Sequence, residues 1–122
     1  MLFIKISVLK TNLLPQQKDL IEKKIRQLEK YCRYFRRNLN LDISIEKANS
    51  LETKNVYTAE ARLYIPGNDI YSKVEASSIE ELADSLKDNL KRLIIEHKKT
   101  RESFFRRTAR KFKEKLFWHR LK

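Results

Sequence analysis

The sequence holds very few of the residues from which disulfides, metal centres and phosphate-binding loops are built. It contains one glycine, one cysteine and two histidines among 122 residues. A single cysteine cannot form an internal disulfide, and no cysteine–histidine cluster has the spacing of metal ligands. The lone glycine, Gly67, excludes the glycine-rich loops that wrap phosphates in many nucleotide-binding enzymes. We therefore expect neither a metal nor a cofactor.

Other absences narrow the function further. His97 and His119 lie in separate segments, and the acidic residues form no pattern beyond solvated positions, so we expect no catalytic residue and no enzyme. No apolar run approaches the roughly 18 residues of a membrane-spanning helix, so we expect no integral membrane segment. The N-terminal segment lacks the apolar stretch and cleavage site of a signal peptide, and Cys32 fits a core thiol. These features predict a cytoplasmic protein.

Positive charge is what the chain has in excess. Lysine and arginine number 28 against 16 acidic residues, which gives a formal net charge of +12. A charge this far from zero indicates a polyanionic partner, either nucleic acid or an anionic membrane surface. The length predicts one domain with an appendage, and the composition divides the chain into residues 1–100 and 101–122.

The hydropathy pattern predicts four strands and two helices. Apolar and polar residues alternate over 2–8, 39–46, 57–65 and 70–76, with a polar loop at 49–55 and a Pro-Gly turn at 66–69. Helical spacing predicts helices over 15–35 and 79–97, the second opened by a capping box at residues 78–81. Because each strand can bury only one face, we expect an α+β, two-layer β-α-β-β-β-α sandwich with both helices on one face of a four-stranded sheet.

The first predicted helix has two opposite faces. Its apolar and basic residues both recur at spacings of three and four, and the basic set lags by two positions, about 200° around a helix. One face can pack on a core while the other presents cations in a row that suits phosphates; a merely solvated face is the other interpretation. The apolar face is Ile21, Ile25, Leu28, Cys32 and Phe35; the basic face is Lys23, Arg26, Lys30, Arg33 and Arg37.

The opposite face of the predicted sheet is not cationic. A sheet that binds RNA would show stacking aromatic residues among basic ones. Tyr64 and Tyr71 can face outward here, and we interpret them as a cross-strand pair that supports the sheet. The charged residues of this face are three cations and four anions: Lys5, Asp42, Glu46, Glu60, Arg62, Lys73 and Glu75.

Residues 101–122 form a basic, aromatic tail with nine basic and two acidic residues. Apolar residues recur at helical spacing, and no glycine or proline separates them from the second helix, so we expect one continuous helix. The tail could contact RNA, dock in a protein groove, lie on an anionic membrane, or fold back over the domain. Its candidate contacts are Arg106, Arg107, Arg110, Lys111 and Lys113.

Three stretches resemble the ribosome hibernation-promoting factor family, also called ribosome-associated inhibitor A. They are residues 20–31 (LIEKKIRQLEKY), the turn at 65–70 (IPGNDI) and residues 84–92 (DSLKDNLKR). The order and spacing of these stretches across residues 1–100 carry the resemblance, which is to the short form without a separate C-terminal dimerisation domain. It implies a domain similar in fold to double-stranded RNA-binding domains.

The resemblance also implies a function. Family members bind the small ribosomal subunit through ribosomal RNA, occupy the channel of mRNA and tRNA, and silence translation in stationary phase or stress. Carried over by position, the RNA contacts are Lys24, Lys30, Arg92 and Lys98. The basic face of the first helix adds Lys23, Arg26, Arg33 and Arg37, and Lys87 and Lys91 lie beside Arg92.

Two other functions stay open at this point. One is a general double-stranded RNA-binding module that acts away from the ribosome. The other is an adaptor that binds a membrane surface or a protein through residues 104–121. On the ribosome, ribosomal proteins are the candidate partners of the tail, and we expect no small-molecule substrate.

Overall fold

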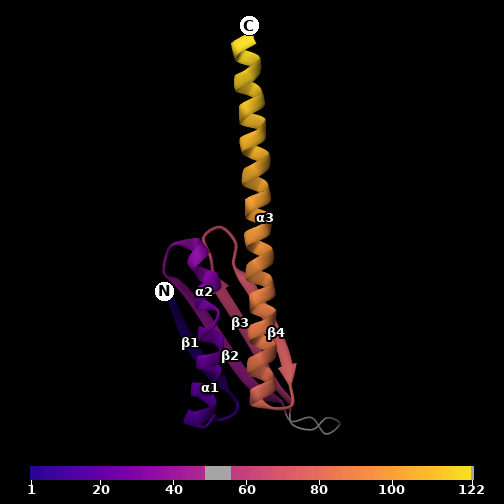
Figure 1. The fold of residues 1–122 in the computed structure, drawn as a ribbon. Coiled ribbons are helices and arrows are strands. Elements are labelled where there is room, and N and C mark those ends of the chain that lie inside the picture. The colour runs from indigo at the N-terminus through magenta and orange to yellow at the C-terminus, as the bar shows by residue number, and fades with distance from the viewer. Residues whose placement is uncertain (49–55, 122) are drawn as a thin grey trace.

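A four-stranded sheet covered on one face by helices accounts for the part of the chain that the computed structural model describes, residues 1–48 and 56–121 (Figure 1). The predicted α+β sandwich is confirmed, and the predicted loop at 49–55 lies outside the described residues. The elements in chain order are β1 (Leu2–Leu9), α1 (Pro15–Arg26), α2 (Glu29–Cys32), the 3₁₀ turn η1 (Arg33–Phe35), β2 (Leu39–Ala48), β3 (Val56–Tyr64), β4 (Ile70–Ala76) and α3 (Ile79–Leu121).

The strands lie across the sheet in sequence order, β1-β2-β3-β4. β1 and β2 are parallel and are joined by the crossover through α1, α2 and η1, whereas the other neighbouring strands are antiparallel. β3 and β4 form the predicted hairpin, in which the Asn68 amide donates to the Ile65 carbonyl at 3.2 Å. Gly67 has a φ of +92° in this turn, a conformation that glycine adopts without the steric penalty of a Cβ.

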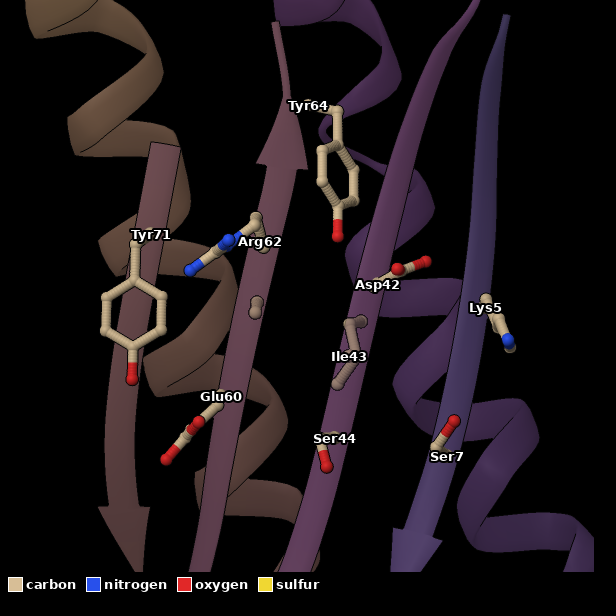
Figure 2. A pocket seen from close by; sticks show the side chains of 10 residues that line it. Lys5, Ser7, Asp42, Ile43, Ser44, Glu60, Arg62, Tyr64 and Tyr71 are labelled. Carbon is tan, nitrogen blue, oxygen red and sulfur yellow. The ribbon is translucent and has the colours of Figure 1, made fainter. Parts of the chain in front are cut away.

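The uncovered face of the sheet carries a shallow hollow of mixed charge (Figure 2). The Arg62 guanidinium lies 5.9 Å from the ring centre of Tyr71, and these two residues are direct partners across the β3–β4 hairpin. Tyr64 is paired with Asn40 of β2 instead. The predicted Tyr64–Tyr71 cross-strand pair is therefore wrong, because the register places arginine opposite Tyr71.

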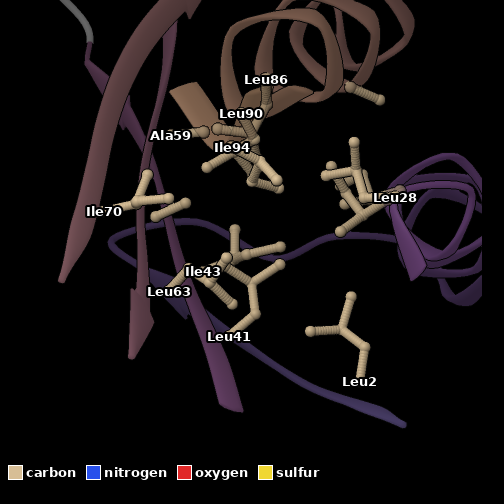
Figure 3. Close-up of a cluster of buried hydrophobic side chains, with 14 of the residues drawn as sticks. Leu2, Leu28, Leu41, Ile43, Ala59, Leu63, Ile70, Leu86, Leu90 and Ile94 are labelled. Carbon is tan, nitrogen blue, oxygen red and sulfur yellow. The ribbon is translucent and has the colours of Figure 1, made fainter. Parts of the chain in front are cut away.

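The hydrophobic core lies between the sheet and the helices (Figure 3). Inward side chains of the strands, such as Ile43 and Leu63, meet Leu86, Leu90 and Ile94 of α3. The apolar face predicted for the first helix points into this core: Ile21, Ile25, Leu28 and Cys32 are buried and Phe35 is half-buried. The alternation along each strand thus gives the sheet one apolar and one polar face.

The continuous helix predicted over residues 15–35 is wrong. α1 ends at Arg26, and the amides of Gln27 and Leu28 donate to carbonyls only three residues back, at 3.3 and 2.9 Å. This is the tighter 3₁₀ pattern, which advances further around the axis per residue than an α-helix. Leu28 and Cys32 stay buried in the core on either side of the start of α2. Arg37 lies beyond η1 altogether.

α3 is one continuous helix of 43 residues, as the absence of glycine and proline predicts. The Ser78 hydroxyl caps its start by accepting a hydrogen bond from the Glu81 amide at 3.2 Å. Among the described side chains, the last buried one is Ile94, and the helix then runs on past the end of the sheet (Figure 1). The tail therefore extends away from the domain and does not fold back over it.

The burial of Cys32 makes its reactivity a measure of folding. Burial, aided by the negative charge of Glu29, raises the pKa of this thiol from 9.0 to about 11. The thiolate is the nucleophile, so the fraction of Cys32 present as thiolate at pH 8 decides the rate of reaction. This fraction should be about a hundredfold lower in the folded protein than in the unfolded chain. We therefore expect iodoacetamide to alkylate Cys32 about a hundredfold more slowly in the native protein than in the unfolded chain. Mass spectrometry of samples taken over time measures the two rates. Equal rates with and without urea would contradict the buried position.

Candidate nucleic-acid interface

Lysine and tyrosine side chains gather where α2 and η1 meet α3. The ammonium groups of Lys30 and Lys91 both lie 5.2 Å from the ring centre of Tyr31. The ammonium group of Lys98 lies 5.2 Å from the ring centre of Tyr34. Three cations from two distant parts of the sequence thus converge on two aromatic rings through cation–π contacts. We call these five residues the lysine–tyrosine cluster.

Helical spacing and the core place the cluster. On α3, Lys91 and Lys98 are seven residues apart, two turns of helix, so they lie on one face. The buried Ile94 lies between them and attaches that part of α3 to the core. On the other side, the buried Cys32 holds α2 and η1 against the same core. The cluster is therefore carried by two elements that pack on one support.

The lysines of the cluster act electrostatically on the hydroxyl of Tyr31. A hydrogen bond from Lys91, together with the charges of Lys30 and Lys91, lowers the pKa of the Tyr31 hydroxyl below its ordinary value of 10.0, although desolvation opposes the shift. The same concentration of ammonium groups that stabilises a phenolate would stabilise a bound phosphate, since both are oxygen anions.

Lys24 and Lys87 lie further along the two helices, toward the start of α3. Lys24 of α1 forms an ion pair and hydrogen bond with Asp84 of α3. This contact links the helices and neutralises part of the charge of Lys24. Lys87 is half-buried one turn after Asp84. The two lysines extend the basic surface beyond the cluster.

Arg26 makes contacts that hold the N-terminus of the chain. Its guanidinium donates to the Leu2 carbonyl at 3.2 Å and to Glu22 at 3.1 Å. It also lies 3.8 Å from Glu29, whose carboxylate accepts a hydrogen bond from the Leu2 amide at 3.2 Å. Arg26 therefore joins α1 and α2 to the first strand, and much of its charge is engaged within the protein.

Arg92 is held on the β4 side of α3. It donates to Asn89 at 2.7 Å and to Glu96 at 3.1 Å. Asn89 in turn donates to the hydroxyl of Ser72, the buried polar residue of β4. This chain of hydrogen bonds directs Arg92 toward the edge of the sheet and away from the lysine–tyrosine cluster.

The other residues predicted to bind RNA are exposed where the structure describes them. Lys23, Arg33 and Arg37 are exposed, and no described ion pair engages them. In the tail, Arg106 and Arg107 are exposed on the part of α3 beyond the sheet. The side chains of Arg110, Lys111 and Lys113 lie outside the described residues.

The sequence reasoning missed Tyr31 and Tyr34 as candidate RNA contacts. They lie three residues apart, in the run Lys30, Tyr31, Cys32, Arg33, Tyr34, and so share one side of their helical turn. Aromatic residues interleaved with basic ones are the combination that binds single-stranded nucleic acid, because bases stack while cations bind the backbone. That interleaving was the signal available in the sequence.

The part of the chain that the structure describes contains neither a metal-ligand cluster nor a membrane-spanning helix. No group of three or more histidine, cysteine, aspartate or glutamate residues there could hold a metal ion. None of the helices there is both long enough and apolar enough to span a bilayer.

Solved structures share this fold. A ribosomal subunit interface protein from Coxiella burnetii is similar with a TM-score of 0.65 and 22% identity, over 80% of this chain and 98% of that chain. The N-terminal domain of Protein Y from Thermus thermophilus is similar with a TM-score of 0.57 and 21% identity, over 77% of this chain and 96% of that chain. Because both identities are low, these similarities show a common fold and nothing more. A search of curated proteins finds no match.

The family comparison is more specific. The family model described as "Sigma 54 modulation protein / S30EA ribosomal protein" matches residues 4–102. The match includes all of α1, α2, η1, β2, β3 and β4, and all of β1 except its first two residues. This agrees with the resemblance to hibernation-promoting factors noted in the sequence. The chain therefore belongs to the sigma 54 modulation protein / S30EA ribosomal protein family.

Proposed function

We propose that this protein binds the small ribosomal subunit through ribosomal RNA and keeps idle ribosomes from translating. The observation that supports this most directly is the lysine–tyrosine cluster, where three ammonium groups converge in a chain of a ribosome-associated family. Phosphates of folded RNA are the polyanion that such a surface fits, since neutralising them releases bound counterions. A role at the ribosome in stationary phase or stress would place the protein in the cytoplasm.

The proposed mechanism is steric occlusion. The domain binds by charge and then fills space in the channel that mRNA and tRNA need, so it inhibits without making or breaking a bond. Such a mechanism needs a rigid body and a basic surface, and no catalytic residue. The sheet with its single core supplies the first, and the helix layer supplies the second.

The cations divide into three groups in this proposal. Lys30, Lys91 and Lys98 are the principal phosphate contacts. Lys23, Arg33 and Arg37 flank them and are free to bind further phosphates, and Lys87 extends the surface along α3. Lys24, Arg26 and Arg92 contribute less, because carboxylates or carbonyls of the protein already engage them.

We further propose that residues 1–100 are the ribosome-binding domain and that residues 101–122 add a second contact. The core includes Ile94 but no described side chain after it, so the tail is not needed to complete the fold. Arg106 and Arg107 in the tail are exposed and suit an RNA or an acidic patch on a ribosomal protein.

The test is sedimentation of the full chain with purified small subunits through sucrose gradients at increasing salt. We expect co-sedimentation at about 50 mM salt and release toward about 200 mM, with a log–log slope of about −3 or steeper, since each neutralised phosphate contributes roughly −0.9. A protein that stays at the top of the gradient at low salt would contradict the proposal. Equal competition by a plain RNA duplex would indicate a general duplex-binding module instead.

A further inference from the structure

A pocket of about 470 Å³ lies between α2–η1 and α3, within the roughly 300–1,000 Å³ typical of ligand sites. Its apolar lining includes the rings of Tyr31 and Tyr34 and the side chain of Ile95. Its polar lining is mostly cationic, with three lysines and one glutamate: Lys30, Lys98, Lys99 and Glu102. We call it the tyrosine pocket. Its chemistry suits a ligand that is flat and apolar in one part and anionic in another.

The ring of Tyr34 packs against a second aromatic ring. Phe35 packs edge-on against it, with ring centres 5.3 Å apart and planes at 75°. Phe35 itself contacts the ring of His97 on α3 at 5.7 Å. Tyr34 is half-buried, so part of its ring stays accessible to the pocket. A braced, accessible aromatic ring is a stacking platform that needs little reordering when a base binds.

The lysines of the pocket can exchange partners when a nucleotide enters. In the free protein the ammonium of Lys98 lies over the Tyr34 ring, and that of Lys30 over the Tyr31 ring. Exposed cation–π contacts of this kind are weak. A base stacking on Tyr34 would displace the ammonium of Lys98, which would then be available to the phosphate of the same nucleotide. Stacking and a charged hydrogen bond then replace one weak contact.

We infer that the tyrosine pocket binds one unpaired purine nucleotide of RNA, with the base stacked on Tyr34 and the phosphate held by Lys30 and Lys98. The inference rests on the proposed RNA binding and deepens it: the protein would recognise an unstacked nucleotide as well as the phosphate backbone. A purine is favoured because its larger ring system offers more stacking area. A base inside a duplex cannot enter, since its faces are covered by its neighbours.

The test uses the full chain and a single-stranded hexaribonucleotide of uridines with one central 2-aminopurine. Stacking quenches 2-aminopurine, so we expect quenching on titration and an affinity about tenfold above that for the same strand with an abasic central residue. Tyr34→Leu should reduce this preference to about onefold, and Tyr34→Phe should retain it because the ring remains. Tyr71→Leu is the control, since Tyr71 lies on the opposite sheet face.

Equal affinity of the unaltered protein for the two strands would overturn the inference, whatever the stability of the variants. Loss of the preference in Tyr71→Leu would also overturn it. These results are separate from the proposed function. A protein that co-sediments with small subunits but does not prefer the 2-aminopurine strand would refute the tyrosine pocket alone. A protein that prefers the 2-aminopurine strand but does not co-sediment with small subunits would refute only the proposed binding to the ribosome.

Discussion

A protein that carries Lys30→Glu and Lys91→Glu is expected to lose co-sedimentation with small ribosomal subunits. Both ammonium groups lie 5.2 Å from the Tyr31 ring, so the double substitution places two carboxylates where two cations now converge. Each close charge contact that is broken costs about 2–5 kcal/mol, which together lowers affinity by about a thousandfold or more. Binding isotherms from gradient fractions at one fixed salt concentration measure the loss.

The matched control is Lys5→Glu with Lys73→Glu. Both lysines are exposed on the uncovered face of the sheet, and the control changes the net charge by the same amount as the test. Exposed charges more than a Debye length from the RNA are screened, so we expect an affinity within about threefold of the unaltered protein. If both double variants lost affinity equally, the loss would be due to the net charge of the protein and not to the lysine–tyrosine cluster.

Leu90→Ala is expected to lower the free energy of unfolding by about 2–5 kcal/mol. The Leu90 side chain is 0% exposed and lies in the core between α3 and the sheet (Figure 3). Its removal leaves a cavity that the surrounding strands can fill only in part. The loss is a large fraction of the roughly 5–15 kcal/mol that stabilises a domain of ordinary size, and urea denaturation followed by circular dichroism measures it.

Leu14→Ala is the control for this substitution. Leu14 is 60% exposed just before α1, so the same chemical change there should alter stability by less than about 0.5 kcal/mol. A Leu90→Ala protein as stable as Leu14→Ala would show that α3 does not pack on the sheet. Leu90 also precedes Lys91, so loosening α3 should weaken RNA binding at temperatures where the variant begins to unfold.

Local patterns in the sequence were enough to predict the four strands and the long helix α3 of this fold. Alternation at Leu41, Ile43 and Ile45 repeats every second residue, the period of a strand, and each of these side chains is buried. The turn at Gly67 and the uninterrupted helix from Ile79 follow from the conformational freedom of glycine and from the absence of helix breakers. These signals depend on neighbouring residues alone, so one sequence suffices to detect them.

Register and helix ends were predicted less well. Arg62 lies opposite Tyr71 because hydrogen bonding between β3 and β4 sets the register, and residue types alone did not reveal it. Likewise, α1 ends at Arg26 although the apolar spacing continues. The 3₁₀ bonds at Gln27 and Leu28 keep the same residues on the core while changing the path of the backbone.

The sequence by itself determined that the protein is basic and that the uncovered face of the sheet is not the cationic one, because the period of each pattern assigns residues to a face. Only the tertiary structure decided which of these cations are engaged within the protein and which converge on the tyrosine rings. Arg26 and Lys30 both belong to the predicted basic face, yet Arg26 bonds to the Leu2 carbonyl whereas Lys30 meets Lys91 at Tyr31. Those partners are distant in the chain, and only packing of α1, α2 and α3 on one sheet brings them within contact.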